Sequence, residues 1–594
     1  MTGADRSACP GRGLSDAAAI DAIVDERPAK RWIEVGGDGA GAARLASALG
    51  LHPLAARVLA ARGFADPAAA RAFLDAPLHG LPDPFSMKGM AAAVARLAAA
   101  LERGERIATY GDYDVDGVTS TVLLSSFLRA AGGDVVTYTP HRLVEGYGLN
   151  TAAVEKLAAA GVKLLVSLDC GITSVEEVRA AAALGVETVV VDHHTVPVEL
   201  PAAVAILNPH QPGCAFPSKE LSAVGVTFML LMALRRTLRE AGRFGDARPE
   251  PNLKQALDLV ALGTVADVVP LTGANRILVR HGLAEIAATR RPGLRALKRV
   301  AGVAEGAVTA GQVGFRLGPR INAAGRLDDA GRGVRLLSTA DEAEAGALAS
   351  ALDRENQARQ EIERRMLAEA LDDAAAAVRR GARGLVLARE GWHAGVVGIV
   401  AARVAERFHR PAVLIGFDGA EGKGSGRSIE GFHLYDALAA CRGHLARFGG
   451  HRHAAGVTIA ATEVVPFRAA FEAHAAAALA PEDLVPRCRI DAWVAEGDLT
   501  ARAAEDLERL GPYGAGHQEP VFAFRSRPAR ARTVGAGAAH LKLGLAGLDA
   551  IGFSMGDRLD LCQGPVEAAF TLGFDDWDGT RRLQLKLRDL RASG

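Results

Sequence analysis

The feature that most constrains the fold is an alternation of short apolar runs with helical stretches, which begins at Arg106. The runs RIATY, KLLVSL and TVVV are rich in strand-forming residues, and helical stretches lie at 118–131, 151–160 and 174–184. Strands and helices that alternate in this way form a parallel sheet covered by helices on both faces. The sequence therefore predicts an α/β domain over residues 106–339.

The rest of the chain shows different patterns on either side of this domain. Acidic residues at the start and basic residues at the end favour one long helix over 340–380. A second strand and helix pattern predicts another α/β domain over 381–480. Short strands separated by Gly and Asp turns over 481–594 are typical of a small β-barrel of the oligonucleotide-binding (OB) type. Residues 1–105 are interpreted as an N-terminal leader followed by a helical extension.

Composition limits the kinds of partner and the cellular compartment. The 69 basic and 69 acidic residues balance, so an anionic partner must be held by a local patch of charge. None of the six cysteines forms a C-x-x-C pair, which argues against a zinc ribbon and a disulfide framework. No apolar run approaches the roughly 20 residues of a membrane helix, and no signal-peptide core is present. We expect a cytoplasmic protein without membrane association.

The first chemical motif, YGDYDVDG, contains Asp112, Asp114 and Asp116 and follows the first predicted strand. We expect the next helix to open at Val118. Three carboxylates this close repel one another unless a cation lies between them. An EF-hand loop would need Glu at its twelfth position, where this chain has Leu123. A solvated acidic turn is the remaining alternative for this motif taken alone.

Three more polar groups follow apolar segments further along the chain. Asp169 follows LLVSL, the triplet of Asp192, His193 and His194 follows VVV, and Asp267 ends the apolar stretch 253–266. Singly, these residues could be a helix cap, surface histidines and an ordinary helix end. Because parallel strands present their carboxyl ends at one edge of a sheet, we expect the groups to converge there.

The convergence of so many carboxylates predicts a metal site. Without compensation, several carboxylates in one crevice would be strongly unfavourable. Two divalent ions would relieve the repulsion and suit in-line attack at phosphorus. Mixed oxygen and imidazole ligands favour Mn²⁺, with Mg²⁺ as the alternative.

These motifs together resemble the DHH phosphoesterase superfamily and, within it, the RecJ family of single-strand-specific 5′→3′ DNA exonucleases. Further segments carry the resemblance over roughly residues 50–594: PHRLVEGYG at 140–148, GANR at 273–276, GPRINAAGR at 318–326, GSGRS at 424–428, GGHRHAAG at 449–456, GPYGAGHQEP at 511–520 and HLKL at 540–543. The resemblance implies a DHH catalytic domain, a DHH-associated substrate-binding domain after the long helix, and a C-terminal OB-fold domain.

The resemblance also implies roles for individual residues. The expected metal ligands and catalytic residues are Asp114, Asp116, Asp169, His193 and Asp267. Asp112 either ligates a metal itself or contacts the residues that ligate it. His194 either ligates or contacts the scissile phosphate, and Asp192 is expected to orient the two histidines.

A phosphodiester substrate needs cations and donors beyond the metals. The candidates lie mostly in loops rich in Gly or Pro and are Arg142, Arg320, Asn322, Ser425, Arg427 and His451. Ser425 and Arg427 could both donate to one phosphate, with the guanidinium binding in a bidentate manner.

The predicted function is therefore a metal-dependent exonuclease that releases 5′-mononucleotides from single-stranded DNA in repair and recombination. The resemblance implies single-stranded DNA, a single-strand-binding protein and a RecQ-type helicase as partners, and we expect a monomer. One rival keeps the metal chemistry but acts on short RNA, cyclic dinucleotides or polyphosphate. Another is a metal-free scaffold that binds single strands.

Overall fold

The computed structural model describes residues 28–141, 144–146, 148–327, 331–575 and 580–593. The chain forms two compact units. Unit 1 combines the chain up to Arg71 with Gln360–Leu510 and Pro520–Gly594, and unit 2 combines Ala72–Arg359 with Gly511–Glu519. Most of the predicted leader, residues 1–27, lies outside the described residues.

Unit 2 is built on a five-stranded sheet in the order β3-β2-β4-β5-β6, and every neighbouring pair is parallel. The strands are β2 (Arg106–Gly111), β3 (Val135–Tyr138), β4 (Val162–Leu168), β5 (Glu187–Val191) and β6 (Ala205–Leu207). Their apolar residues are buried on both faces, which explains why the runs are almost continuously hydrophobic. The predicted parallel sheet is confirmed.

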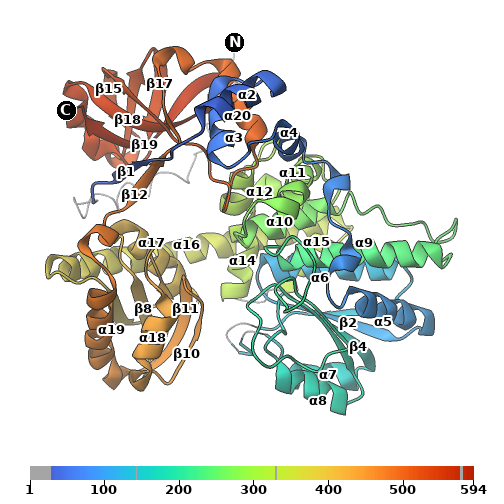
Figure 1. Ribbon diagram of the computed structural model, residues 1–594. Coiled ribbons are helices and arrows are strands. Elements are labelled where there is room, and N and C mark those ends of the chain that lie inside the picture. The colour runs from blue at the N-terminus through green and yellow to red at the C-terminus, as the bar shows by residue number, and fades with distance from the viewer. Residues whose placement is uncertain (1–27, 142–143, 147, 328–330, 576–579, 594) are drawn as a thin grey trace, which may run out of the picture. The chain divides into compact units, whose positions relative to one another are not determined.

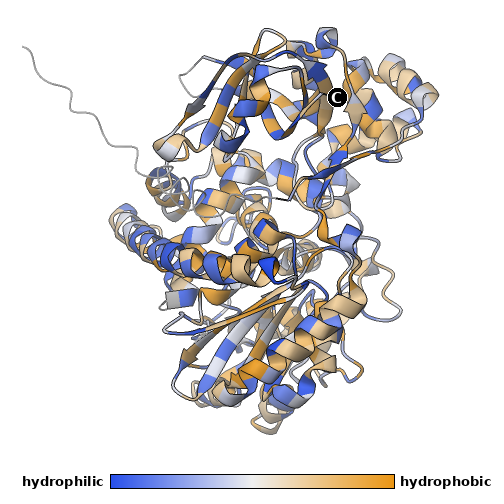
Figure 2. Ribbon diagram, turned by 90° about the vertical axis from the view of Figure 1, so that its left-hand side faces the viewer, coloured by the Kyte–Doolittle hydropathy of each residue, from blue (hydrophilic) through white to orange (hydrophobic). Residues whose placement is uncertain are grey.

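Helices cover both faces of this sheet (Figure 1). One face packs against α5 (Met90–Arg103), α6 (Val115–Ala130) and α9 (Ala223–Glu240), and the other against α7 (Thr151–Ala159) and α8 (Val175–Ala183). The remaining helices of unit 2 include α10 (Leu257–Ala266), α11 (Gly273–Ala287), α12 (Pro292–Val300), α14 (Gly318–Leu327) and α15 (Gly331–Ser338). Many helices carry both apolar and polar residues around their circumference, as Figure 2 shows.

The start of α6 differs from the prediction. The sequence places the helix after the acidic motif, at Val118, but the structure begins it at Val115. The reason is that Asp114 caps the helix, so Asp116 and Gly117 belong to its first turn.

One 38-residue helix, α16 (Glu342–Arg379), contributes residues to both units. Asp341 precedes it and accepts the backbone N–H groups of Ala343 at 2.7 Å and Glu344 at 2.9 Å. The predicted long helix over 340–380 is confirmed with bounds shifted by one or two residues.

Unit 1 contains a five-stranded mixed sheet in the order β10-β11-β9-β8-β7. Its strands are β7 (Leu385–Glu390), β8 (Ala412–Asp418), β9 (Glu421–Arg427), β10 (Arg447–Gly450) and β11 (Ala454–Ala460), and only β7 and β8 pair in parallel. The helices of this part are α17 (Val397–Phe408), α18 (Leu434–Ala440) and α19 (Val464–Ala478).

Unit 1 also contains a seven-stranded sheet in the order β13-β14-β18-β19-β17-β16-β15. Its strands are β13 (Ala492–Trp493), β14 (Phe522–Ser526), β15 (Ala529–Val534), β16 (His540–Leu545), β17 (Leu548–Gly552), β18 (Val566–Asp575) and β19 (Arg582–Ala592), and helix α20 (Ala501–Leu510) accompanies them. The strand-rich, OB-type character predicted for residues 481–594 is confirmed, with helix α20 in addition to the strands.

The N-terminal part of the described chain belongs largely to unit 1. Strand β1 (Arg31–Glu34) pairs in parallel with β12 (Arg487–Ile490), and α2 (Gly39–Leu49), α3 (Pro53–Ala61) and α4 (Pro67–Asp75) follow. The backbone N–H of His52 donates to the Asp506 carboxylate of α20 at 2.8 Å. Among the helices in the described ranges, none has both the length and the apolar character needed to cross a membrane.

Candidate metal centre

The acidic loop after β2 leads directly into helix α6. Asp112 is buried at the start of this loop. Asp114 caps the helix, and its Oδ1 accepts the backbone N–H groups of Asp116 at 2.9 Å and Gly117 at 3.2 Å. Carboxylates are favoured at a helix N-terminus by its free N–H groups and its dipole. The loop thus gathers carboxylates at the carboxyl edge of the sheet.

Gly117 lets the first turn of α6 approach the backbone of Asp112. A Cβ atom at this glycine would lie 2.4 Å from the carbonyl oxygen of Asp112 and 2.6 Å from its nitrogen. Backbone atoms in a packed interior cannot move aside to make that space. The glycine of the motif therefore has a steric role, which keeps Asp112 beside the carboxylates of α6.

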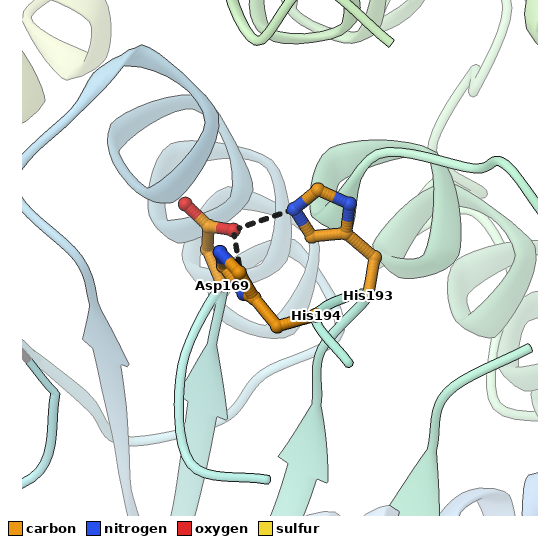
Figure 3. A group of neighbouring side chains, drawn as sticks. All are labelled: Asp169, His193 and His194. Atoms are coloured by element: carbon orange, nitrogen blue, oxygen red, sulfur yellow. Dashed lines mark ion pairs between the residues drawn. The ribbon is translucent and has the colours of Figure 1, made fainter. Parts of the chain in front are cut away.

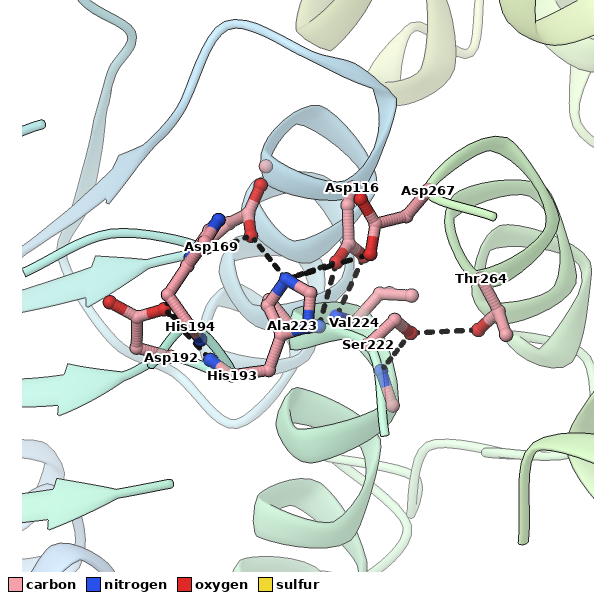
Figure 4. A network of polar contacts seen from close by, with 12 residues as sticks. Asp116, Asp169, Asp192, His193, His194, Ser222, Ala223, Val224, Thr264 and Asp267 are labelled. Atoms are coloured by element: carbon pink, nitrogen blue, oxygen red, sulfur yellow. Dashed lines mark hydrogen bonds and ion pairs between the residues drawn. The ribbon is translucent and has the colours of Figure 1, made fainter. Parts of the chain in front are cut away.

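Asp116 is held by the N-terminus of another helix. Its Oδ2 accepts the backbone N–H of Ala223 at 2.7 Å, and its Oδ1 accepts that of Val224 at 2.9 Å (Figure 4). These donors belong to the first turn of α9, where backbone N–H groups have no partner within the helix. The buried carboxylate is thereby fixed in orientation.

Asp169 follows β4 and adopts an unusual backbone conformation. Its φ angle is +64°, in the left-handed region, while its N–H donates to the carbonyl of Val191 at 2.9 Å. For a residue other than glycine this conformation costs on the order of 1–3 kcal/mol, and such strain is often found at functional sites.

Asp192 holds both histidines that follow it. Its Oδ1 accepts the backbone N–H groups of His193 at 2.7 Å and His194 at 3.0 Å, and lies 2.7 Å from the Nδ1 of His194. Its Oδ2 accepts the N–H of Ile172 at 2.9 Å. This bond connects the segment 192–194, called the DHH turn here, to the loop that carries Asp169. A carboxylate in such a position sets the orientation of imidazole rings.

The predicted ligands come together in three overlapping groups that could each hold a metal ion. The groups are Asp112, Asp114 and Asp169; Asp116, His193 and Asp267; and Asp169, His193 and His194, with the ligand atoms of each group within 4.8 Å of one another. Figure 3 shows both imidazoles close to the Asp169 carboxylate. The Nε2 of His193 lies 3.2 Å from Asp169 Oδ1, 3.5 Å from Asp267 Oδ2 and 3.9 Å from Asp116 Oδ2.

Electrostatics make this cluster unfavourable without a cation. Burial, followed by repulsion from Asp114, raises the pKa of Asp116 to about 7. Burial and neighbouring carboxylates also raise the pKa of Asp169 and of Asp267. Divalent ions would reverse these shifts by stabilising the ionised carboxylates.

The histidines differ in their electrostatic environment. Burial, together with the neighbouring His194, lowers the pKa of His193 to about 4, so its imidazole is neutral near pH 7, as a metal ligand must be. Burial also disfavours charge on His194, but its bond to Asp192 outweighs this and raises the pKa of His194. Among the described residues, none hydrogen-bonds the buried Nε2 of His193. The donor set and this buried nitrogen fit a divalent transition metal.

Two predicted substrate contacts lie together in unit 1. The predicted loop is wrong here: Ser425 and Arg427 lie on strand β9, where the Arg427 Nη1 donates to the Ser425 Oγ at 2.8 Å. A Cβ atom on Gly398, in the first turn of α17, would lie 3.0 Å from Ser425 Oγ and 3.2 Å from Arg427 Nη2. His451 lies in the turn between β10 and β11, and Ala454 after that turn pairs with Arg427. Together these groups present donors and positive charge beside a helix N-terminus.

The other predicted substrate contacts have different surroundings. Arg320 lies on helix α14 and not in the predicted loop, and its Nε donates to the Asp353 carboxylate at 2.8 Å. Asn322 on the same helix accepts the backbone N–H of Val115 at 3.1 Å, and so contacts the start of α6. Arg142 lies outside the described residues.

One buried residue beside the centre was missed by the sequence-based analysis. Asn208 directly follows β6, and its Nδ2 donates to the carbonyl of His194 at 2.9 Å. The signal was present, because this asparagine also ends an apolar strand of the sheet. The strand has only three residues, which made it too short to recognise.

Comparison with known families identifies three domains in the chain. The DHH family N-terminal domain matches residues 106–264, the DHHA1 domain matches 381–476, and the RecJ OB domain matches 490–589. The single-stranded-DNA-specific exonuclease RecJ of Dickeya dadantii is 44% identical over 537 residues, which cover 87% of this chain and 93% of that protein. RecJ of Escherichia coli is 40% identical over 555 residues, which cover 90% and 95%.

Solved structures give the same result. RecJ from Thermus thermophilus in complex with Mn²⁺ aligns with a TM-score of 0.81 and 35% identity, covering 95% of this chain and 80% of that one. Its complex with Mg²⁺ aligns with a TM-score of 0.75 and 33% identity, covering 95% and 79%. The arrangement of carboxylates and histidines, the three domain matches and these relatives agree: the chain belongs to the RecJ family of DHH phosphoesterases.

Proposed function

We propose that the chain is a metal-dependent exonuclease that hydrolyses single-stranded DNA from the 5′ end and releases 5′-mononucleotides. The observation that carries this proposal is the cluster of buried and half-buried carboxylates and histidines at the carboxyl edge of the unit 2 sheet. Its relatives are named single-stranded-DNA-specific exonucleases, and the RecJ OB domain argues against the shorter phosphodiesterases that act on small substrates. A metal-free scaffold would have to keep this cluster uncompensated.

The cluster is proposed to hold two Mn²⁺ ions, with Mg²⁺ as a substitute. The proposed ligands are Asp112, Asp114 and Asp169 for one ion and Asp116, His193 and Asp267 for the other. When bound, the ions activate a water molecule and stabilise charge on the scissile phosphate and the leaving 3′ oxygen.

The surrounding residues prepare this site for a phosphodiester. Asp192 keeps both imidazoles in position, with its Oδ1 at 2.7 Å from the Nδ1 of His194, and His194 is proposed to contact the scissile phosphate. The amides of Ala223 and Val224 hold the carboxylate of Asp116 in a single orientation. Such fixed groups limit the reorganisation that the reaction requires.

Ser425, Arg427 and His451 are proposed to bind the phosphate at the 5′ end. The serine hydroxyl and the guanidinium lie 2.8 Å apart beside the first turn of α17, so both can donate to one anion. Arg142, Arg320 and Asn322 remain proposed contacts of the strand. The ion pair of Arg320 with Asp353 would have to exchange for a phosphate.

Arg427→Ala is expected to weaken binding of a 5′-phosphorylated single strand by about 1.5–3 kcal/mol, because a charge-assisted hydrogen bond is lost. The KM should rise while kcat changes little, measured on a 5′-phosphorylated oligonucleotide. Arg403→Ala is a matched control, since this arginine is 58% exposed on α17 and is paired with Glu363. An unchanged KM and kcat in Arg427→Ala would remove this residue from the binding site.

The proposal also covers the domain boundaries, the binding partners and the cellular location of the protein. We retain the boundaries 1–105, 106–339, 340–380, 381–480 and 481–594. The proposed partners beyond single-stranded DNA are a single-strand-binding protein and a RecQ-type helicase, acting with a monomeric enzyme in repair and recombination. Because its substrate would be chromosomal DNA, we propose a cytoplasmic location.

The strand requirement tests the substrate class. We expect rapid digestion of a single-stranded oligonucleotide and little digestion of the same sequence as a blunt duplex, with single-stranded RNA as a further control. Affinity should fall with salt by about 0.7 log units per log unit of salt for each phosphate neutralised. A blunt duplex digested as fast as the single strand, without a helicase, would contradict the proposal.

A further inference from the structure

A cavity of about 360 Å³ lies directly beside the proposed metal centre in unit 2. Its lining residues are His193, Thr195, Val196, Pro197, His210 and Pro212. One wall is the loop that continues from the DHH turn, and the other is the turn that follows β6. Because His193 belongs both to this wall and to the proposed metal ligands, a molecule in the cavity would lie next to the reacting phosphate.

Asn208 connects the two walls. Its side chain is fully buried, its Nδ2 donates to the carbonyl of His194 at 2.9 Å, and its Oδ1 accepts the N–H of His210 at 2.8 Å. Gln211 supports the second wall, since its Nε2 donates to the carbonyl of Ile206 at 2.7 Å. The cavity is therefore formed by fixed backbone segments, and binding would require little rearrangement.

The chemistry of the lining favours an uncharged ligand with a flat apolar part and a polar edge. Val196, Pro197 and Pro212 offer apolar surface, Thr195 and His210 are polar, and the described lining residues include no carboxylate. The volume lies in the range of about 300–1,000 Å³ that is usual for small-molecule pockets. A nucleoside has these properties, and the phosphate joined to its sugar would extend toward the cluster at His193.

We propose that this cavity binds one of the two nucleosides that flank the scissile phosphate. The inference rests on the proposed exonuclease function and adds to it a contact with the base, close to the metal centre and separate from the phosphate contacts of unit 1. It also gives Asn208 a positioning role, because one amide holds both the DHH turn and the base-binding wall.

The test compares 5′-phosphorylated oligonucleotides that carry an abasic site at the first or the second nucleotide with the unmodified strand. For the full-length protein with Mn²⁺, an abasic site at one of these positions should lower kcat/KM by roughly tenfold, the size of a lost base contact. In His210→Ala and Pro212→Ala, the ratio of kcat/KM for the unmodified strand to kcat/KM for the abasic strand should fall toward one. Both side chains are exposed, so these variants should fold.

Val198→Ala serves as the matched control. Val198 lies in the same loop, is fully exposed and does not line the cavity, so this variant should keep the ratio of the unaltered chain. The proposal is overturned if His210→Ala and Pro212→Ala keep that ratio too, or if neither abasic position slows the unaltered chain. A chain that degrades no single strand would instead contradict the proposed function itself.

A photocrosslink provides a second, direct measurement. A 5-iododeoxyuridine at the sensitive position should crosslink to a peptide that contains residues 195–197 or 210–212. Crosslinks found only in other segments would overturn the assignment of the cavity.

Discussion

Asp169→Ala is expected to reduce turnover by roughly a thousandfold or more while leaving the binding of single-stranded DNA largely intact. The Asp169 carboxylate belongs to two of the three ligand groups and lies 3.2 Å from the Nε2 of His193. Its loss would therefore remove a ligand of one proposed ion and a neighbour of His193, a ligand of the other. The proposed phosphate contacts of Ser425 and Arg427 are on another domain and would remain. Turnover on a labelled oligonucleotide and equilibrium binding by fluorescence anisotropy would measure the two effects separately.

Asp134→Ala is a suitable control for this experiment. Asp134 is in the same unit, is 51% exposed and pairs with Arg106 at the surface. It should change neither turnover nor binding by more than a small factor. If Asp169→Ala kept turnover within tenfold of the unaltered chain, the carboxylate would not belong to the reacting centre.

Removal of divalent metal is expected to abolish activity, and Mn²⁺ is expected to restore it, with Mg²⁺ as a weaker substitute. No cysteine is in the three ligand groups, so zinc should not be required. Because burial and mutual repulsion raise the pKa values of Asp116, Asp169 and Asp267, bound Mn²⁺ should also stabilise the fold. At a concentration of 100 times its Kd, one bound ion adds about 2.7 kcal/mol.

The thermal unfolding midpoint provides a readout that does not depend on activity. It should rise with Mn²⁺ in the unaltered chain and rise much less in Asp169→Ala. Full activity in a metal-stripped sample that is kept in chelator would contradict the metal-dependent mechanism.

Much of the centre was predictable because β-strands in a parallel sheet end at a common edge. Asp112, Asp169 and Asp192 each follow an apolar run. Because strands and helices alternate along the chain, these runs were expected to form parallel strands whose carboxyl ends lie at one edge of the sheet. Asp267 was harder to place, since it follows helix α10 and reaches the cluster only through tertiary packing.

Other features could not be read from local patterns. Strand β1 pairs with β12, but its four residues are too few to give a periodic signal in the sequence. The His52 N–H bonds to Asp506, which lies 454 residues later in the chain, so no local pattern could indicate this contact. The true start of α6 depended on Asp114 acting as a cap. The role of Gly117 follows only from the structure, in which a Cβ atom on this glycine would lie 2.4 Å from the carbonyl oxygen of Asp112.

The most direct test of the account is to follow the same single-stranded oligonucleotide labelled at its 5′ end or at its 3′ end during digestion with Mn²⁺. We predict that the 5′ label is released early as a mononucleotide, while the 3′ label stays in a strand that shortens progressively. Asp169→Ala should release neither label at a comparable rate. Early release of the 3′ label as a mononucleotide, or internal fragments from both substrates, would contradict a 5′→3′ exonuclease.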